Sequence, residues 1–496
     1  MKVAELLSYT PVELDFGTSG LRGLVTDMTD LECYINTCGF IEFLINEGLV
    51  QQGATVLVGG DLRESTPRII KAVAQAITDK GMIPLFCGYI PTPALAYYGL
   101  EQQTACIMVT GSHIPADRNG IKFYKPDGEV LKADETAIKI AVSSERSAVY
   151  QQPIEQASFS AEGMLKTYSN PEFLDTIEKQ ALAVYVQRYT DVFADQPLTG
   201  KKVVMYQHSA VGRDVVVEIL EALGAEVVPY GRSKTFVPID SENVTDEDKQ
   251  LFRKIVSENP GCFAIVSTDG DSDRPFVIDA EGTFYRGDIL GCLVTEYLDL
   301  EYVATPISSN DAVDVFCEQQ NIASSHTKIG SPYVIVAMQE AHDKYQRIGG
   351  WEVNGGFLLG ANIDIEGKTL KALPTRDAVL PILLALLLAI KKDLPVAETF
   401  ARLPRRYTGG GLVDDVPMDQ ISRFKERVVS GYFTPEAINR ILVGEDTTIQ
   451  SVDTTDGLRV YFDNGDVIHA RPSGNAPQMR VYTNCDTQRV GNRHQV

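Results

Sequence analysis

The sequence predicts an α/β protein of several domains that ends in an α+β domain. The chain has 496 residues, too many for one hydrophobic core, and this length favours roughly three or four domains. Hydrophobic residues make up 44% and charged residues 23% of the chain, an ordinary globular composition. Short apolar runs alternate with stretches of helical apolar spacing, as in domains that are built on a largely parallel sheet.

The first part of the chain shows this alternation clearly. Apolar side chains at helical spacing predict a helix over Pro67–Thr78. Apolar runs predict three strands, at Thr55–Val58, Met82–Phe86 and Ala105–Val109. The stretch Val142–Gly163 is rich in Ser, Gln, Glu and Ala and has little periodicity, so we expect a surface connection there.

Two more α/β units follow along the chain. For the second unit the pattern predicts a helix at Gly212–Leu223 and strands at Lys202–Tyr206, Ala225–Pro229 and Phe263–Val266. The third unit begins near Gly282. Its predicted elements are the helix Gly287–Leu298, the strand Val303–Ile307 and an apolar helix that ends at Lys391.

After Leu394 the pattern changes. It predicts a helix at Met418–Val429 and strands at Gly457–Phe462, Val467–Ala470 and Met479–Thr483. The turn Asp463–Asp466 contains Asn-Gly, a strong hairpin signal between two strands. We therefore expect this last part to be α+β.

Charge and cysteine content exclude several classes of protein. The formal net charge of −22 and the pI of about 4.8 argue against nucleic acid or an anionic membrane as a partner, because both need basic patches. The longest apolar run, Ala378–Ile390, is shorter than the roughly 20 residues of a membrane-spanning helix. The eight cysteines form no C-x-x-C pair, and no secretory signal is recognised, so we expect a reduced, cytoplasmic protein.

The segment Val109–Lys122 places reactive groups in a loop. Ser112 and His113 follow a predicted strand almost directly, and Lys122 closes the segment. Glycines and a proline interrupt it, so it is poorly suited to core packing. The pattern raises the hypothesis of a reactive or phosphorylatable serine.

A second loop carries three carboxylates two residues apart, Asp269, Asp271 and Asp273. They can converge on one hard cation such as Mg²⁺, although a solvated acidic turn explains the pattern as well. An EF-hand is excluded, because the sixth position counted from Asp269 is Arg274 instead of glycine. Arg274 is a candidate for holding a phosphate beside the cation.

Two further loops have residues that suit a sugar phosphate. Glu352 and Asn354 lie in a glycine-rich loop and can bind pairs of sugar hydroxyls, although a tight turn is the simpler explanation. The second loop can form an anion-binding nest or merely a turn between strands, and its residues include Arg471, Ser473, Gly474 and Asn475.

Two cations lie in other loops. Arg22 belongs to the glycine-rich opening Phe16–Gly23, which is not a Walker loop because no G-K-[ST] follows. Lys328 is a lone cation for which solvation is the ordinary explanation. Taken together, the loops supply the parts of phosphoryl transfer on a sugar: a serine carrier, a metal, fixed cations and a site for hydroxyls.

These motifs, in this order, resemble the α-D-phosphohexomutase superfamily over nearly the whole chain. The T-G-S-H-x-P serine loop matches Thr110–Pro115, and the D-G-D-x-D-R metal loop matches Asp269–Arg274. The other matching segments are the F-G-T-x-G-x-R-G opening at Phe16–Gly23, Gly60–Arg63, Pro91–Pro93, the sugar loop Gly350–Gly356 and the phosphate loop Arg471–Pro477.

The resemblance implies four domains around a central cleft. Three would be α/β domains with mixed, mostly parallel sheets, and the last an α+β domain. We expect domain I at 1–165 with the serine loop, domain II at 166–284 with the metal loop, domain III at 285–394 with the sugar loop and domain IV at 395–496 with the phosphate loop.

The resemblance also implies an enzyme that moves phosphate between O6 and O1 of a hexose. Ser112 would carry the phosphate, a hexose 1,6-bisphosphate would form and also serve as activator, and Mg²⁺ would lie between the phosphoserine and the three aspartates. Arg22, Lys122, Arg274 and Lys328 would line the reacting end, with Lys122 or His113 as acid and base. The sugar hydroxyls would bind Glu352 and Asn354, and the other phosphate would bind Arg471, Ser473, Gly474 and Asn475.

Three positions depart from common family patterns: Ile114 in place of Asn, Gly356 in place of the His of some relatives, and Asn475-Ala476 in place of Thr-Glu. The sugar loop and the opening are most similar to those of bacterial phosphomannomutases, so we expect mannose 6-phosphate and mannose 1-phosphate as substrates. Phosphoglucomutase and phosphoglucosamine mutase are the alternatives. An inactive sugar-phosphate-binding protein and a metal-dependent phosphatase are alternatives of other classes, and we expect a monomer or homodimer.

Overall fold

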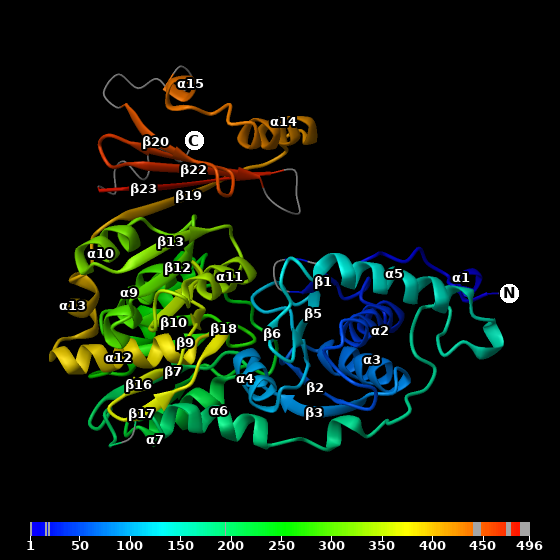
Figure 1. Cartoon of the computed structure of the whole chain (residues 1–496). Coiled ribbons are helices and arrows are strands. Elements are labelled where there is room, and N and C mark those ends of the chain that lie inside the picture. The colour runs from blue at the N-terminus through cyan, green and yellow to red at the C-terminus, as the bar shows by residue number, and fades with distance from the viewer. Residues whose placement is uncertain are drawn as a thin grey trace.

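The computed structural model describes residues 2–14, 17, 20–193, 195–439, 448–472 and 478–486. Within them the strands form four large sheets and the two-stranded hairpin of β16 (Ile363–Ile365) and β17 (Lys368–Leu370). Figure 1 shows the first sheet on one side, the second and third together on the other, and the C-terminal sheet above β13 and α10.

The first sheet is ordered β1-β5-β4-β2-β3, with β6 beside β5. Along β2, Val56 and Val58 pack with one group of helices and Leu57 packs on the opposite face, as the two-residue period of a strand requires. The strands are β1 (Leu21–Leu24), β2 (Thr55–Gly60), β3 (Ile83–Tyr89), β4 (Cys106–Val109), β5 (Arg118–Lys125) and β6 (Gly128–Glu129). The helices are α1 (Val3–Leu6), α2 (Asp30–Asn46), α3 (Thr66–Asp79), α4 (Thr92–Gln102) and α5 (Glu135–Gln151).

The second and third sheets are ordered β11-β10-β9-β7-β8 and β13-β12-β14-β15-β18. The second contains β7 (Lys202–Tyr206), β8 (Glu226–Tyr230), β9 (Ala264–Thr268), β10 (Pro275–Ile278) and β11 (Phe284–Tyr285), with α6 (Gln180–Thr190), α7 (Arg213–Ala222) and α8 (Asp246–Glu258). The third contains β12 (Tyr302–Pro306), β13 (Ala323–Thr327), β14 (Ile348–Trp351), β15 (Phe357–Leu359) and β18 (Leu373–Asp377). Its helices are α9 (Gly287–Leu298), α10 (Ala312–Gln320), α11 (Ser331–Ala341), α12 (Val379–Lys392) and α13 (Val396–Ala401).

The first three sheets repeat one arrangement. In each, the middle strand lies parallel to one neighbour and antiparallel to the strand that follows it in the chain: β4 and β5, β9 and β10, β14 and β15. The serine loop, the metal loop and the sugar loop are the connections within these three pairs. All three candidate loops therefore leave equivalent strands at their carboxyl ends, where ligands of open α/β sheets bind.

The C-terminal sheet is entirely antiparallel, in the order β19-β23-β22-β21-β20. Its strands are β19 (Tyr407–Val413), β20 (Ile449–Asp453), β21 (Leu458–Phe462), β22 (Val467–Pro472) and β23 (Met479–Cys485), and α14 (Met418–Val429) and α15 (Pro435–Asn439) accompany it. The buried Arg459 donates hydrogen bonds to the carbonyl oxygens of Ile307 and Ser309. Asn310 Nδ2 lies 2.8 Å from Thr408 Oγ1, so this sheet docks on the third one.

The largest hydrophobic cluster joins the second and third sheets with one face of the first. It contains side chains of α4, α6, α7, α9 and α12. The apolar run predicted as a buried helix is α12, whose side chains from Val379 to Ala389 are all buried. Among the described residues, no helix combines the length and the apolar character that crossing a bilayer requires.

The predicted fold class is confirmed: three α/β parts with mixed sheets precede a C-terminal part with an antiparallel sheet and two helices. The strands and helices predicted in each part are present within two or three residues at their ends. The exact domain boundaries stay a prediction, and the one placed between residues 284 and 285 falls inside β11.

One sequence expectation is wrong. The stretch predicted as a surface connection, Val142–Gly163, begins inside α5, which continues to Gln151. Ile138, Ala141 and Val149 of this helix are buried in the same cluster as α2. A narrow apolar stripe is enough to dock a helix whose other faces are polar. In this segment the many polar residues made the few apolar positions too sparse to predict a helix.

Candidate active site

The serine loop leaves the end of β4 in a strained conformation. Ser112 is buried and has a φ of 54°, in the left-handed region that a serine seldom adopts. Its backbone N–H donates to Thr110 Oγ1 over 2.8 Å. Strain of this kind persists only where the surroundings impose it, and it is found most often at functional sites.

Two residues at the end of β2 impose this conformation. Arg63 donates to the carbonyl oxygens of Ser112 (2.9 Å), Ile114 (2.6 Å) and Pro115 (2.6 Å). Asp61 accepts hydrogen bonds from Thr110 Oγ1 over 2.7 Å and from Arg63 Nε over 3.2 Å. The sequence had marked Gly60–Arg63 only as a family-like segment; charged residues directly after an apolar strand were the available signal for a role in the site.

The metal loop brings the three predicted aspartates together. Asp269, Asp271 and Asp273 are fully buried, and one carboxylate oxygen of each lies within 4.8 Å of the others. Ser112 Oγ donates to Asp269 Oδ2 over 2.5 Å. Asp271 Oδ1 and Asp273 Oδ1 are buried without a hydrogen-bond partner. Buried, unpaired carboxylate oxygens are the donors that Mg²⁺ prefers, so this set of residues fits the predicted metal.

The surrounding charges shift the pKa values of two aspartates of this loop in opposite directions. Burial raises the pKa of Asp269, and the charges of Asp271 and Asp273 raise it further. Burial also acts to raise the pKa of Asp273, but the charges of Arg376, Lys122 and Arg274 outweigh it and the pKa is lowered. A divalent cation among the three carboxylates would relieve their mutual repulsion.

Two of the predicted cations of the reacting end, Lys122 and Arg274, lie beside the same carboxylates. Lys122 Nζ lies 2.6 Å from Asp271 Oδ2 and 2.7 Å from Asp273 Oδ2. Arg274 Nη1 lies 3.1 Å from Asp240 Oδ1, a contact that the sequence did not predict. Lys122 was expected to close a loop, but it lies on β5, which begins at Arg118. The loop and the strand that follows it both contribute to one site.

Arg22 and His113 lie in the field of these cations. The side chain of Arg22 is partly open to solvent, but desolvation by the surrounding protein atoms, with the charges of Arg274 and Arg376, lowers its pKa to about 10. His113 Nδ1 lies 3.4 Å from Ser112 Oγ. Burial lowers the pKa of His113 well below its usual range, and Arg274 and Arg22 add to this effect, so its imidazole is neutral.

The sugar loop approaches the metal loop through an arginine. Glu352 Oε2 accepts a hydrogen bond from Arg376 Nη1 over 2.6 Å, and Arg376 Nη2 lies 2.9 Å from Asp273 Oδ2. Asn354 Nδ2 lies 3.5 Å from Glu242 Oε1. Sequence reasoning missed Arg376; its signal was a charged residue pair, Arg-Asp, immediately before the apolar helix.

Lys328 was expected at the reacting end, but it lies with Arg471 in a separate hollow between the third and fourth sheets. The hollow has a volume of about 410 Å³, and Lys425 and Asp456 also line it. Asp456 Oδ2 accepts from the backbone N–H of Ile329 over 3.1 Å, and Asp456 Oδ1 lies 3.7 Å from Arg471 Nε. The predicted phosphate-binding residues Ser473, Gly474 and Asn475 lie outside the described residues, so their roles stay a prediction.

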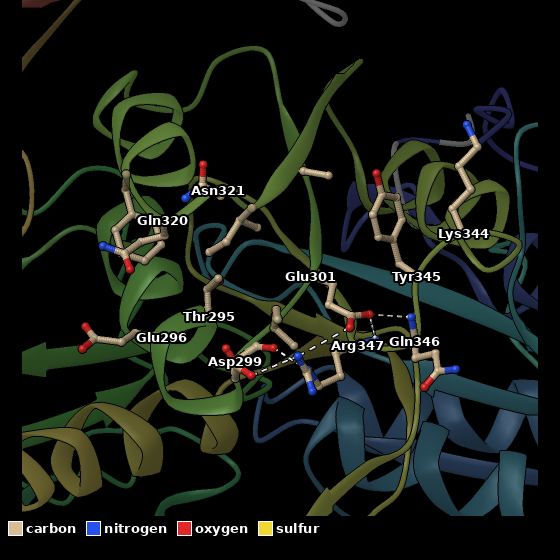
Figure 2. A pocket seen from close by; sticks show the side chains of 14 residues that line it. Thr295, Glu296, Asp299, Glu301, Gln320, Asn321, Lys344, Tyr345, Gln346 and Arg347 are labelled. Atoms are coloured by element: carbon tan, nitrogen blue, oxygen red, sulfur yellow. Dashed lines mark hydrogen bonds and ion pairs between the residues drawn. The ribbon is translucent and has the colours of Figure 1, made fainter.

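A larger hollow of about 810 Å³ lies at the opposite edge of the third sheet. It is lined by residues that precede β12, β13 and β14, at the amino ends of these strands. Figure 2 shows Arg347 in this hollow between Asp299 and Glu301. None of the residues predicted for the site lines it, so volume alone does not locate the reactive groups.

The geometry as a whole suits a phosphoryl group on Ser112. The hydroxyl faces three carboxylates that fit a divalent cation, and Lys122, Arg22 and Arg274 supply positive charge around it. Catalysis of phosphoryl transfer consists mostly of such positioning and charge neutralisation.

Comparison with known proteins gives a consistent result. The family models of the phosphoglucomutase/phosphomannomutase alpha/beta/alpha domains I, II and III match residues 13–148, 172–282 and 286–407. The chain is 40% identical to a phosphomannomutase of Sinorhizobium fredii, over 95% of each protein. It is also 40% identical to a phosphomannomutase of Salmonella muenchen, over 96% of this chain and 92% of that protein.

A solved structure has the same fold. It is a phosphoglucomutase/phosphomannomutase family protein from Burkholderia thailandensis, which superposes with a TM-score of 0.70 over 96% of this chain and 94% of that one. The two sequences share 18% identity, so this likeness concerns the fold.

Proposed function

Because the chain belongs to the phosphoglucomutase/phosphomannomutase family, we propose that it interconverts mannose 6-phosphate and mannose 1-phosphate through a phosphoserine at Ser112. The choice of mannose rests on the 40% identity to two phosphomannomutases over nearly the full chain. The observation that carries the reaction type is the 2.5 Å approach of Ser112 Oγ to Asp269, inside a ring of carboxylates and cations.

The proposed reaction has two transfers. In the first, the bond between phosphorus and Ser112 Oγ breaks and a bond to the free sugar hydroxyl forms, which gives mannose 1,6-bisphosphate. The proton of that hydroxyl passes to a base, either Lys122 or His113. The bisphosphate then turns over in the site. In the second transfer, the bond between the other phosphorus and its sugar oxygen breaks, and a bond to Ser112 Oγ forms. The base returns its proton to the released sugar oxygen, and the product leaves with one phosphate.

Asp269, Asp271 and Asp273, with an oxygen of the phosphoserine, would hold Mg²⁺. The ion supplies positive charge that stabilises the transferring phosphoryl group. Arg274 and Arg22 would add fixed charge at the same end of the substrate. Without these positive charges, the carboxylates of the site would repel the negative charge of the transferring phosphoryl group.

The remaining contacts would orient the sugar. Glu352 and Asn354 can accept from and donate to adjacent hydroxyls, and Lys328 and Arg471 share one hollow that can take the phosphate of the other end. The described part of this phosphate site supports the proposal through its two cations, and Ser473, Gly474 and Asn475 would complete it.

The test is an activity assay on purified protein that has been primed with mannose 1,6-bisphosphate. We expect conversion of mannose 1-phosphate to be faster than that of glucose 1-phosphate or glucosamine 1-phosphate, and intact mass should show a phosphoryl group that is lost in Ser112→Ala. Faster turnover of glucose 1-phosphate would identify a phosphoglucomutase instead. Release of inorganic phosphate without isomerisation would indicate a phosphatase, and binding without any reaction an inactive sugar-phosphate-binding protein.

Two coarser proposals accompany the reaction. All eight cysteines are unpaired and buried, which supports a reducing, cytoplasmic location. A monomer or a homodimer is proposed for the assembly, and light scattering distinguishes them against the chain mass of 54.4 kDa.

A further inference from the structure

Arg376 connects two loops that come from different sheets. It is the last residue but one of β18 (Leu373–Asp377), and it is 5% exposed. Its Nη1 lies 2.6 Å from Glu352 Oε2, and its Nε and Nη2 lie 3.0 and 2.9 Å from Asp273 Oδ2. One guanidinium therefore binds a predicted metal ligand and a predicted sugar ligand at once, and its planar fork fixes the angle between them.

The residues on either side of Arg376 hold the strand end in place. Thr375 Oγ1 donates to Glu129 Oε1 of the first sheet over 2.5 Å. Asp377 accepts hydrogen bonds from the hydroxyls of Tyr185, over 2.6 Å, and Tyr189, both on α6. Because side chains alternate along a strand, these two anchors leave Arg376 directed to the opposite side, between the loops.

The aliphatic part of Arg376 also shapes the sugar loop. A Cβ atom at Gly356 would lie 2.7 Å from Arg376 Cδ and 2.8 Å from its Cβ and Cγ, closer than real side chains approach. The loop can close over Arg376 only because residue 356 is glycine. The position of Glu352, four residues earlier, thus depends on this arginine through packing as well as through charge.

The orientation of Asp273 follows from the same contact. Its Oδ2 is occupied by Arg376 and Lys122, and its Oδ1 is buried and has no hydrogen-bond partner. Because Arg376 and Lys122 engage Oδ2, a cation can bind at Oδ1, which lies 3.9 Å from Arg274 Nε without a hydrogen bond.

We propose that Arg376 is a positioning residue that holds the metal ligand Asp273 and the sugar ligand Glu352 at a fixed distance and orientation relative to one another. The proposal deepens the proposed mutase function and rests on it. Loss of the guanidinium fork would weaken both metal binding and sugar binding, although Arg376 need not contact the metal or the sugar itself.

The test compares Arg376→Gln and Arg376→Lys with Arg347→Gln, a matched control. Arg347 also lies between two carboxylates, Asp299 and Glu301, but at the opposite edge of the same sheet. Replacing the partner of a metal ligand typically lowers metal affinity or activity by 10- to 100-fold, roughly, so we expect kcat/KM of Arg376→Gln to fall in that range and Arg347→Gln to match the wild type. Arg376→Lys keeps the charge but not the fork, and should recover stability more than it recovers KM.

Two measurements separate positioning from general loss of structure. Calorimetric titration of the dephosphorylated protein with Mg²⁺ should show weaker binding in Arg376→Gln, with no need for turnover. In a cycle with Glu352→Gln, the two losses in kcat/KM should not add, because both changes break the same contact.

Several results would overturn the proposal. Wild-type Mg²⁺ affinity and wild-type KM in folded Arg376→Lys or Arg376→Gln would do so, as would additive losses in the cycle. If Arg376→Gln does not fold, Arg376→Lys decides the matter by the same two readouts. A wild-type protein without mutase activity would instead refute the proposed function. The Mg²⁺ titration would still test whether Arg376 positions Asp273.

Discussion

The two edges of the third sheet carry the same chemical motif in different surroundings. At the carboxyl edge Arg376 lies between Asp273 and Glu352, and all three side chains are at most 8% exposed. At the amino edge Arg347 lies between Asp299 and Glu301, with exposures of 40%, 85% and 38%. The buried arginine joins a loop of the second sheet to a loop of the third, whereas the exposed one joins neighbouring parts of a single sheet.

This contrast shows that an ion pair acquires a functional role through burial and through what it connects. The amino edge has the larger hollow, about 810 Å³, and the side chains labelled in Figure 2 are polar. Exposed pairs of this kind contribute about 0–1 kcal/mol, because water competes for each partner. At the carboxyl edge, water is excluded, and each charge needs its partners.

The largest expected difference between the edges concerns turnover. Asp271→Asn removes one of the three carboxylates that fit a metal, and we expect kcat to fall by roughly 10³-fold or more. Asp299→Asn is the matched change at the amino edge, at a left-handed position that asparagine tolerates. It should leave kcat unchanged within about twofold. Steady-state measurement of kcat with mannose 1-phosphate tests this prediction. Equal losses of kcat in both variants would contradict a difference in function between the two edges.

Replacing an arginine should also lower the free energy of unfolding more at a carboxyl edge than at the amino edge. Arg63→Met at the carboxyl edge of the first sheet leaves the buried carboxylate of Asp61 without its cation, which typically costs about 3–5 kcal/mol. The corresponding change Arg347→Met breaks an exposed pair and should cost about 0–1 kcal/mol. Urea unfolding of both variants measures these values, and similar losses would show that burial is not the deciding factor.

Acid should destabilise the carboxyl edge through a buried histidine. His208 follows β7, and its Nε2 donates to the carbonyl oxygen of Thr268 over 2.7 Å. Its pKa is lowered to about 4, mainly by burial. The unfolded chain, with a pKa near 6.5, binds the proton more readily, so stability is present above pH 6.5 and is lost as the pH falls towards 4. The loss amounts to about 3 kcal/mol.

His208→Gln removes this titration and keeps a polar side chain. The gap in unfolding free energy between wild type and variant should therefore shrink or reverse between pH 7 and pH 4. A gap that does not change with pH would mean that His208 is protonated equally in the folded and unfolded protein.

The smallest expected effect concerns a single methyl group. Gly356→Ala places a Cβ against Arg376 and should destabilise by about 1–3 kcal/mol while raising KM for the sugar. Gly411→Ala in β19 meets open space and should change stability by less than about 0.5 kcal/mol. Thermal unfolding and KM are the readouts. A tolerated Gly356→Ala would show that Arg376 does not control the loop by packing.

Local signals in the sequence were sufficient for most elements of the fold. The strand Lys202–Tyr206 and the helices Gly287–Leu298 and Met418–Val429 have the predicted bounds, because apolar periodicity and turn residues act within a few positions of one another. The end of α5 was missed for the opposite reason. Its helical character depends on packing against α2, and the sequence around it is mostly polar.

The site divides in the same way. The sequence by itself determined which loops carry reactive groups, because Ser112 and the three aspartates lie in short motifs that follow apolar strands. Only the tertiary structure decided their partners: Ser112 and Asp269 are 157 positions apart, and Asp273 and Arg376 are 103 apart. A contact over such distances arises when separate sheets pack together, and no local pattern of residues encodes which side chains then meet.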